Sequence, residues 1–282
     1  RRRAKYLLFK DVPEDFANFL KGKWRYTPTP SLSKVWALME YLTTHPRIDA
    51  NLLRRWAYRT YHQTKRLNLE NQKLHYLSSE LGALKHLKTL NLNRNYLLTL
   101  PPELGKLKKL ENLHLAHNQI AILPAQIKKL KSLHKLDLTA NKGMNNVPAE
   151  IAQLQRISEL NLSQNSFQTL PLSICNLESL DELILAKNQL ETLPKECIKL
   201  IKLKSLDLSY NNFKVLPLDV LSKLERLTTL NIAGNNLTEL PLELKQFPRL
   251  KKVNVQNIHA LDSQKSQLKE SFAPIELIFE NA

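Results

Sequence analysis

Leucine and isoleucine recur at fixed intervals through most of this 282-residue chain. Residues 87–109 read LKTLNLNRNYLLTLPPELGKLKK, and residues 110–132, LENLHLAHNQIAILPAQIKKLKS, repeat the same apolar positions 23 residues later. In LNL and LHL, two apolar residues flank a polar one, which is the period-two pattern of a strand with one buried face. A period of 20 to 50 residues predicts stacked structural repeats, since one repeat alone cannot bury its apolar face.

An asparagine follows each predicted strand at the same position of the repeat. Its spacings are 23, 23, 24, 23, 23 and 24 residues, through Asn95, Asn118, Asn141, Asn165, Asn188, Asn211 and Asn235. We expect the carboxamide to pair with backbone groups that would otherwise be buried without partners. The following Leu-Pro turns the chain to the outer side, because proline fixes φ. One strand per repeat predicts a parallel sheet of nine coils, roughly 40 Å long.

The repeat LxxLxLxxNxLxxLPxxIxxL resembles that of the leucine-rich repeat family, in the form found in Ras-suppressor-type and bacterial intracellular or effector proteins. The resemblance covers about residues 64–261. It implies an α/β solenoid, a horseshoe with the parallel β-sheet on its concave face, and it implies partner binding without naming the partner. The terminal repeats depart from the pattern, because Gln72 and Ile258 take the asparagine position.

The segments outside the repeats are predicted to cover the two ends of the solenoid. Residues 1–63 contain all three tryptophans and two amphipathic runs, which predict a basic helical N-terminal domain or cap. Residues 262–282 predict a C-terminal cap made of a short helix and a strand-like tail. Exposed sheet edges need such covers, since they can pair with other chains.

The net charge of +16 is concentrated near the N-terminus. Residues 1–66 hold 15 Lys and Arg against 5 Asp and Glu. Arg54, Arg55 and Arg59 follow one predicted helix and form a candidate patch for nucleic acid or an acidic partner. Lysines such as Lys108 and Lys129 occupy outward positions on the convex side, with no aromatic residues between them, so a solvated surface is the simpler interpretation.

No catalytic motif is present, and we expect no enzyme activity, cofactor or metal. The pair Cys175 and Cys197 is too small for a disulfide framework. Cys197 takes a position that is apolar in the other repeats, so we interpret it as a buried residue, with a disulfide or a reactive thiol as the alternative. We expect the protein to lie in a reducing compartment. His114 and His117 form a weak HxxH pattern without a third ligand, so solvated side chains are favoured over a metal or acid–base site.

The concave sheet face is the default binding surface of a curved solenoid. One outward column consists of the third residue of each strand. A second column consists of residues that come shortly after each strand. Arg94, Lys187 and Tyr210 belong to residue types that supply binding energy in interfaces. The predicted partner-binding residues are Asn91, Arg94, His114, His117, Asp137, Asn161, Ile184, Lys187, Asp207 and Tyr210.

A one-residue insertion interrupts the repeat at LTANKGMNNVP, residues 138–148. Asn141 precedes its proline by seven residues, whereas Asn118 precedes Pro124 by six. We interpret this as a tolerated bulge, in which Gly143 accepts a φ that other residues resist. Met144 or Val147 is expected to fill the core. The loop lacks the carboxylates of a calcium site and the glycines of a phosphate cradle.

Three functions remain open from the sequence. The first is a non-catalytic, monomeric module that binds another protein, mainly through the concave face. The second is a nucleic-acid or anionic-surface binder that acts through the basic N-terminal region. The third is the recognition part of a larger enzyme or effector whose catalytic domain lies outside this chain, because a start without Met suggests a fragment. No membrane span is visible, and a cytoplasmic location is expected, with a secreted protein as the alternative.

Overall fold

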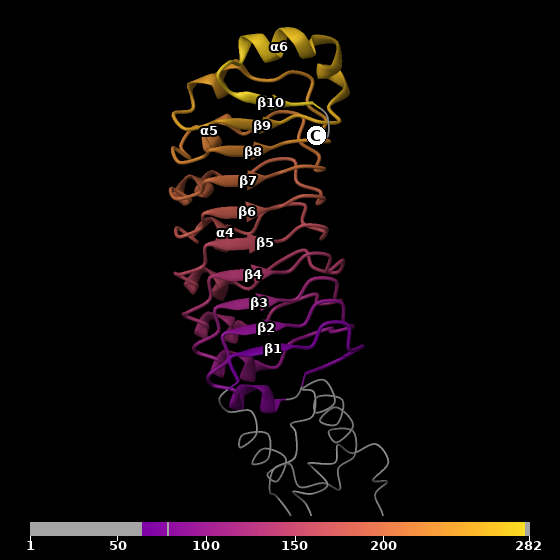
Figure 1. The fold of residues 1–282 in the computed structure, drawn as a ribbon, viewed down its shortest axis with the longest axis vertical. Coiled ribbons are helices and arrows are strands. Elements are labelled where there is room, and N and C mark those ends of the chain that lie inside the picture. The colour runs from indigo at the N-terminus through magenta and orange to yellow at the C-terminus, as the bar shows by residue number, and fades with distance from the viewer. Residues whose placement is uncertain (1–63, 78, 280–282) are drawn as a thin grey trace, which may run out of the picture.

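A computed structural model describes residues 64–77 and 79–279. Figure 1 shows these residues stacked as successive coils, each contributing one strand to a single parallel sheet in chain order. The predicted helices of residues 1–63, with Arg54, Arg55 and Arg59, lie outside the described residues. The strands are β1 (Arg66–Asn68), β2 (Thr89–Asn91), β3 (Asn112–His114), β4 (Lys135–Asp137), β5 (Glu159–Asn161), β6 (Glu182–Ile184), β7 (Ser205–Asp207), β8 (Thr229–Asn231), β9 (Lys252–Asn254) and β10 (Glu276–Ile278).

Each strand buries its central residue and leaves its first and third residues partly exposed. Leu90 in β2 is buried, while Thr89 and Asn91 on either side face outward. Equivalent positions pair in register, so that Leu90 lies beside Leu113 and Asn91 beside His114. The LxL alternation therefore produces a solenoid of α/β class, with a continuous apolar core behind its sheet.

Short helical turns follow the Leu-Pro steps on the opposite side of the coils. Most are single 3₁₀ turns that begin directly after a proline, as at Pro101 and Pro124. They are η2 (Ser79–Ala83), η3 (Pro102–Lys106), η4 (Ala125–Lys129), η5 (Ala149–Gln153), α4 (Leu172–Cys175), η6 (Lys195–Lys199), α5 (Leu218–Leu221) and η7 (Leu242–Gln246). The turn α5 accommodates the extra residue of the second 24-residue interval and buries Leu221.

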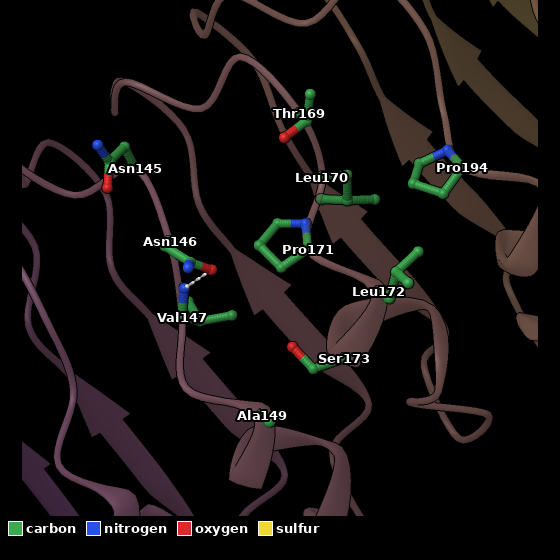
Figure 2. A pocket seen from close by; sticks show the side chains of 10 residues that line it. All are labelled: Asn145, Asn146, Val147, Ala149, Thr169, Leu170, Pro171, Leu172, Ser173 and Pro194. Atoms are coloured by element: carbon green, nitrogen blue, oxygen red, sulfur yellow. Dashed lines mark hydrogen bonds between the residues drawn. The ribbon is translucent and has the colours of Figure 1, made fainter.

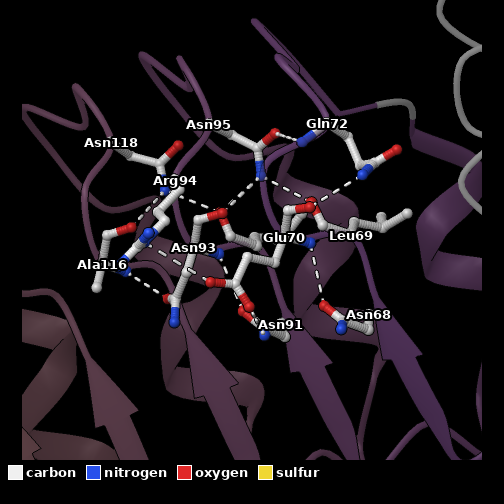
Figure 3. Close-up of polar contacts among 11 residues, drawn as sticks. Asn68, Leu69, Glu70, Gln72, Asn91, Asn93, Arg94, Asn95, Ala116 and Asn118 are labelled. Atoms are coloured by element: carbon white, nitrogen blue, oxygen red, sulfur yellow. Dashed lines mark hydrogen bonds and ion pairs between the residues drawn. The ribbon is translucent and has the colours of Figure 1, made fainter.

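The repeated asparagines form a ladder of buried carboxamides that connects neighbouring coils. The Asn118 Nδ2 group donates to the carbonyls of Leu115 and Leu92, each at 3.0 Å. Its Oδ1 atom accepts from the Leu97 N–H at 3.1 Å. Figure 3 shows Asn95 in the same role beside the first coil, where its Nδ2 group donates to the Leu69 carbonyl and its Oδ1 atom accepts from the Gln72 N–H. The prediction that these side chains satisfy buried backbone groups is confirmed.

The C-terminal residues extend the sheet by one strand. The turn η8 (His259–Gln264) leads into α6 (Lys265–Ser271), and β10 then pairs in parallel with β9. Figure 1 places α6 beyond the last strands, at the yellow end of the solenoid. Phe272 and Leu277 are buried there, so the apolar core continues to this end. The tail thus contains both a helix and a strand.

The two cysteines form a disulfide, contrary to the favoured interpretation of Cys197 as an unpaired buried residue. Cys175 and Cys197 are joined, with Cα atoms 4.3 Å apart, and both side chains are buried. They come from neighbouring coils, in α4 and η6. Stacking brings successive coils to within about 5 Å, and the α-helical turn of α4 buries Cys175, although the next coil exposes Ile198 at the equivalent position.

The predicted role of Gly143 in the bulge is wrong. Gly234 is the one glycine with positive φ among the described residues, so Gly143 needs no left-handed backbone. A β-turn absorbs the extra residue instead, with the Met144 N–H donating to the Asn141 carbonyl at 2.7 Å. The Asn146 side chain then accepts from the Val147 N–H at 2.8 Å. Met144 and Val147 are both buried, as the sequence predicted for either residue.

Candidate interaction surface

The predicted concave residues lie in two adjacent columns along the sheet. Asn91, His114, Asp137, Asn161, Ile184 and Asp207 are register partners in successive strands. Each is the outward third residue of its strand and is partly exposed. The period-two rule equally predicts that the first residues of the strands share this face, so that Lys135, Glu159 and Glu182 belong to the surface. Our list of candidates omitted them.

The second column follows the strands and has a left-handed backbone in every complete coil. Arg94, His117, Lys187 and Tyr210 have φ values of 57°, 57°, 55° and 53°. This conformation directs the chain away from the sheet just before each ladder asparagine. It is uncommon for residues other than glycine and costs on the order of 1 kcal/mol or more. The sequence gives little sign of it, because the residue types in this column differ from coil to coil.

The first coils hold one polar cluster on this surface (Figure 3). The Glu70 carboxylate accepts a hydrogen bond from the Asn91 carboxamide at 3.1 Å and lies 3.7 Å from the Arg94 Nε atom. These groups are largely exposed, so the ion pair adds little to stability. Arg94 lies in the β2 coil, four coils before Lys187, so Arg94 is not part of a cluster with Lys187 and Tyr210.

A second cluster brings Lys187 and Tyr210 together. The Lys187 Nζ atom lies 5.6 Å from the centroid of the Tyr210 ring, within the range of a cation–π contact. The Tyr210 hydroxyl accepts a hydrogen bond from the Asn257 carboxamide at 2.7 Å, two coils further on. The ring passes over Gly234, where an added Cβ would lie only 2.5 Å from the ring. Gly234 and Asn257 therefore hold Tyr210 along the surface, and neither residue was predicted to matter here.

The His114 imidazole has a pKa below its ordinary value. Burial against the neighbouring strands lowers the pKa below the usual 6.5, and this outweighs the opposing effect of the nearby Asp137 carboxylate. His117 follows in the same coil and is exposed. Within residues 64–77 and 79–279, no three metal-ligating side chains lie close enough together to hold an ion.

We expect acidification to destabilise the protein in part through His114. The folded state holds the neutral imidazole, while the unfolded chain takes up a proton near pH 6.5, so stability falls as the pH drops from 6.5 through the lower folded pKa. Urea titration can measure the free energy of unfolding of wild type and of His114→Asn. As the pH falls from 7 to 5, the difference between the two should shift in favour of the variant. A constant difference across that range would show that His114 does not contribute.

The bulge lines a shallow hollow between two coils (Figure 2). Asn145, Asn146 and Val147 form one wall, and Thr169, Pro171 and Leu172 belong to the next coil. No charged side chain lines the hollow, and the loop sequence contains no carboxylate, as noted above. Thus the hollow offers neither a carboxylate for a calcium ion nor a cationic side chain for a phosphate.

Lysines on the convex side are mostly exposed, as the sequence pattern predicted. Lys108 and Lys131 donate hydrogen bonds to backbone carbonyls of the following coil, at 3.4 and 3.0 Å. In the described part of the chain, no helix is long and apolar enough to cross a membrane. The binding role proposed for Arg54, Arg55 and Arg59 stays a prediction.

Solved structures similar to this chain are leucine-rich repeat proteins. A leucine-rich repeat protein of Leptospira interrogans is 30% identical, with a TM-score of 0.55, over 71% of this chain and 62% of that protein. The plant peptide hormone receptor RGFR1, solved in complex with RGF2, is 30% identical with a TM-score of 0.55, over 67% of this chain and 31% of the receptor. The chain thus spans less than two thirds of either protein.

A third similar structure is TLR13 in complex with ssRNA13, at 29% identity and a TM-score of 0.60, over 68% of this chain and 29% of that protein. No curated protein matches the sequence. Family models match the sequence directly: "leucine rich repeat" matches residues 131–190 and 178–237, and "leucine-rich repeat region" matches residues 58–145. The coils, the asparagine ladder and these matches agree, and the chain belongs to the leucine-rich repeat family.

Proposed function

We propose that this chain is a non-catalytic module that binds a partner protein mainly through the concave face of its sheet. The observation that carries the proposal is the clustering of Lys187 and Tyr210 on that face. Tyr210 is 45% exposed although it is fixed by Asn257 and passes over Gly234. A rigid, exposed aromatic ring next to a cation loses little conformational entropy on binding, and such residues dominate the energetics of interfaces.

One of the similar structures supports the same class of function, whereas TLR13 was solved with an RNA. The receptor RGFR1 was solved with RGF2 bound, so a related solenoid holds a peptide hormone. The surface proposed to bind the partner also presents both charge signs, with Glu182 in β6, Asp207 in β7 and Lys187 after β6. Mixed charge favours a protein surface over a uniformly anionic polymer, because a polyanion would meet repulsion from the carboxylates.

A matched pair of triple variants tests this function. Replacing Arg94, Lys187 and Tyr210 by alanine should reduce partner recovery from a native lysate at least tenfold, since such contacts cost more than ~1 kcal/mol each when truncated. The control replaces Lys202, Lys223 and Arg226, which are exposed on the convex side, and should leave recovery unchanged. Both variants are first compared with wild type by thermal unfolding. Equal recovery with both variants would refute concave-face binding.

We further propose that the chain acts in an oxidising compartment, the alternative to the cytoplasmic location expected from the sequence. The Cys175–Cys197 disulfide supports this, because disulfides persist mainly outside the reducing cytoplasm. Protein taken from its native source can be denatured in an alkylating reagent and weighed by mass spectrometry. We expect no alkylated thiol without prior reduction. Two alkylated thiols would place the protein in a reducing compartment.

A further inference from the structure

The third residue of most strands accepts a hydrogen bond from the backbone two residues later. The Asp207 carboxylate, for example, accepts from the Ser209 N–H at 2.8 Å. This side chain fixes the turn that follows the strand and satisfies an N–H group that faces the concave surface. Seven coils share the bond: Asn68 to Glu70, Asn91 to Asn93, Asp137 to Thr139, Asn161 to Ser163, Asp207 to Ser209, Asn231 to Ala233 and Asn254 to Gln256.

Among the coils of β1 to β9, two carry a residue that does not make this bond, and only one of them is compensated. In the β3 coil, where His114 occupies the position, Asn93 from the preceding coil accepts from the Ala116 N–H at 2.8 Å. In the β6 coil, Ile184 occupies the position and has no side-chain acceptor. The Ala186 N–H is consequently left without an acceptor in the described part of the chain.

In the described part of the chain, no neighbouring side chain accepts a hydrogen bond from the Ala186 N–H, and the side chains of Ser163 and Asp207 bond to other groups. Ser163, the equivalent of Asn93, donates its hydroxyl to the Asn161 carboxamide at 2.7 Å. On the other side, the Asp207 Oδ1 atom accepts from both the N–H and the hydroxyl of Ser209, and its Oδ2 atom accepts from Asn231. Ala186 is partly exposed, and its N–H is therefore a donor available to an incoming ligand.

The same coil presents further outward-facing groups that are open to a ligand. Glu182, at the start of β6, is partly exposed and has no ion-pair partner among the described residues. Ile184 comes next on the same face, and Lys187 follows Ala186 with its ammonium group over the Tyr210 ring. One coil thus presents, in order, a carboxylate, an apolar side chain, a free N–H and a cation.

We propose that the β6 coil is the recognition centre for an extended segment of the partner, with a basic, an apolar and an acidic side chain in that order. The basic side chain pairs with Glu182, the apolar side chain packs on Ile184, and the acidic carboxylate accepts from the Ala186 N–H beside Lys187. This inference rests on the proposed concave-face function and names its partner chemistry. Charge complementarity selects this segment, and the free N–H adds a charge-assisted hydrogen bond.

Spacing in the ligand follows from the coil itself. Residues in extended chains are about 3.3 Å apart, so Glu182 and Ile184 lie roughly 7 Å apart along the strand. The basic and apolar residues of the ligand are therefore separated by one residue. Lys187 lies three residues beyond Ile184, which places the acidic residue two or three positions after the apolar one.

Phage display tests the proposal with the full 282-residue chain as bait. Random 12-residue peptides fused at their C-termini lack a free terminal carboxylate, so an acidic residue must come from a side chain. We expect enriched peptides to share the spacing derived above. A synthetic peptide with the consensus should bind Ile184→Asn at least tenfold more weakly than wild type, measured by fluorescence anisotropy. Val215→Asn, which replaces an exposed valine away from the sheet, is the matched control.

The variant Ile184→Asn should fold, because asparagine occupies this position in the adjoining β5 coil and can accept from the Ala186 N–H. Thermal unfolding checks this directly. Charge exchange adds a test that misfolding cannot imitate: Lys187→Glu should weaken the consensus peptide and recover binding when the acidic residue of the peptide is changed to lysine.

Each other outcome contradicts the inference. If no spacing is enriched, or if enriched peptides bind Ile184→Asn as well as wild type, the β6 coil is not the recognition centre. Should those peptides nevertheless lose binding to the Arg94, Lys187 and Tyr210 triple variant, concave-face binding survives and only the present inference fails. If the enriched peptides bind all of these variants as well as they bind wild type, concave-face binding and the present inference are both refuted.

Discussion

Replacement of Asn211 by alanine is expected to lower the free energy of unfolding by about 3 to 5 kcal/mol. The Asn211 carboxamide is 4% exposed and donates to the carbonyls of Leu185 and Leu208 at 2.9 and 3.0 Å. It also accepts from the Leu190 N–H at 3.0 Å. Alanine would leave these buried backbone groups without partners, at about 1 to 3 kcal/mol for each group left unsatisfied.

The adjacent Asn212 provides a control that changes the same residue type at the next position. Its side chain is exposed, so Asn212→Ala should change stability by less than about 0.5 kcal/mol. Urea unfolding followed by far-UV circular dichroism compares the two variants with wild type. Because stability in stacked repeats is local, hydrogen exchange should show the loss concentrated in the β6 and β7 coils. Similar unfolding midpoints for the two variants would contradict the role assigned to the ladder.

The regular features of the fold could be predicted because they depend on interactions that every coil repeats. The LxL spacing predicts which residue of each strand is buried, and the asparagine spacing predicts where each strand ends. Together they set the register, so that Asn91, His114 and Asp137 were placed in one column before any coordinates. An error of one residue in the spacing would have exposed every leucine of a strand.

Features that depend on one coil could not be predicted in the same way. Cys175 is buried because its turn is α-helical, whereas the same position in the next coil exposes Ile198. The choice between an α and a 3₁₀ turn rests on small local differences in packing, which the repeat pattern does not encode. For this reason the sequence favoured an unpaired cysteine, and the structure contains a disulfide.

The proposed recognition centre stands between these two cases. Its signal was visible in the sequence, since Ile184 is an apolar residue in a column of asparagine, aspartate and histidine. Its meaning depended on the side chains of Ser163 and Asp207, which bond to other groups and leave the Ala186 N–H without an acceptor among the described residues. For the β3 coil, the preceding coil supplies the longer side chain of Asn93, which accepts from the Ala116 N–H, whereas Ser163 takes that position before the β6 coil. The repeat pattern alone does not show which group each of these side chains will bond.

Gly105 is expected to be intolerant of alanine because two coils approach closely there. A Cβ at Gly105 would lie 2.7 Å from the Gln126 carbonyl oxygen and 3.0 Å from the Gln126 Cβ. A backbone carbonyl in the next coil cannot rotate away as a flexible side chain can, so η3 and η4 must separate. We expect Gly105→Ala to lower the free energy of unfolding by about 1 to 3 kcal/mol, the usual cost of overpacking.

Gly143 is the matched control, because it is also a glycine without positive φ. A Cβ added there would meet only the Ala121 Cβ at 3.8 Å, an ordinary van der Waals distance. Gly143→Ala should therefore leave stability unchanged or raise it by up to about 1 kcal/mol, since alanine reduces the freedom of the unfolded chain. We therefore expect urea unfolding to show a lower free energy of unfolding for Gly105→Ala and an unchanged or higher one for Gly143→Ala. If both variants are equally stable, the spacing between η3 and η4 can relax, and close approach does not explain the glycine at 105.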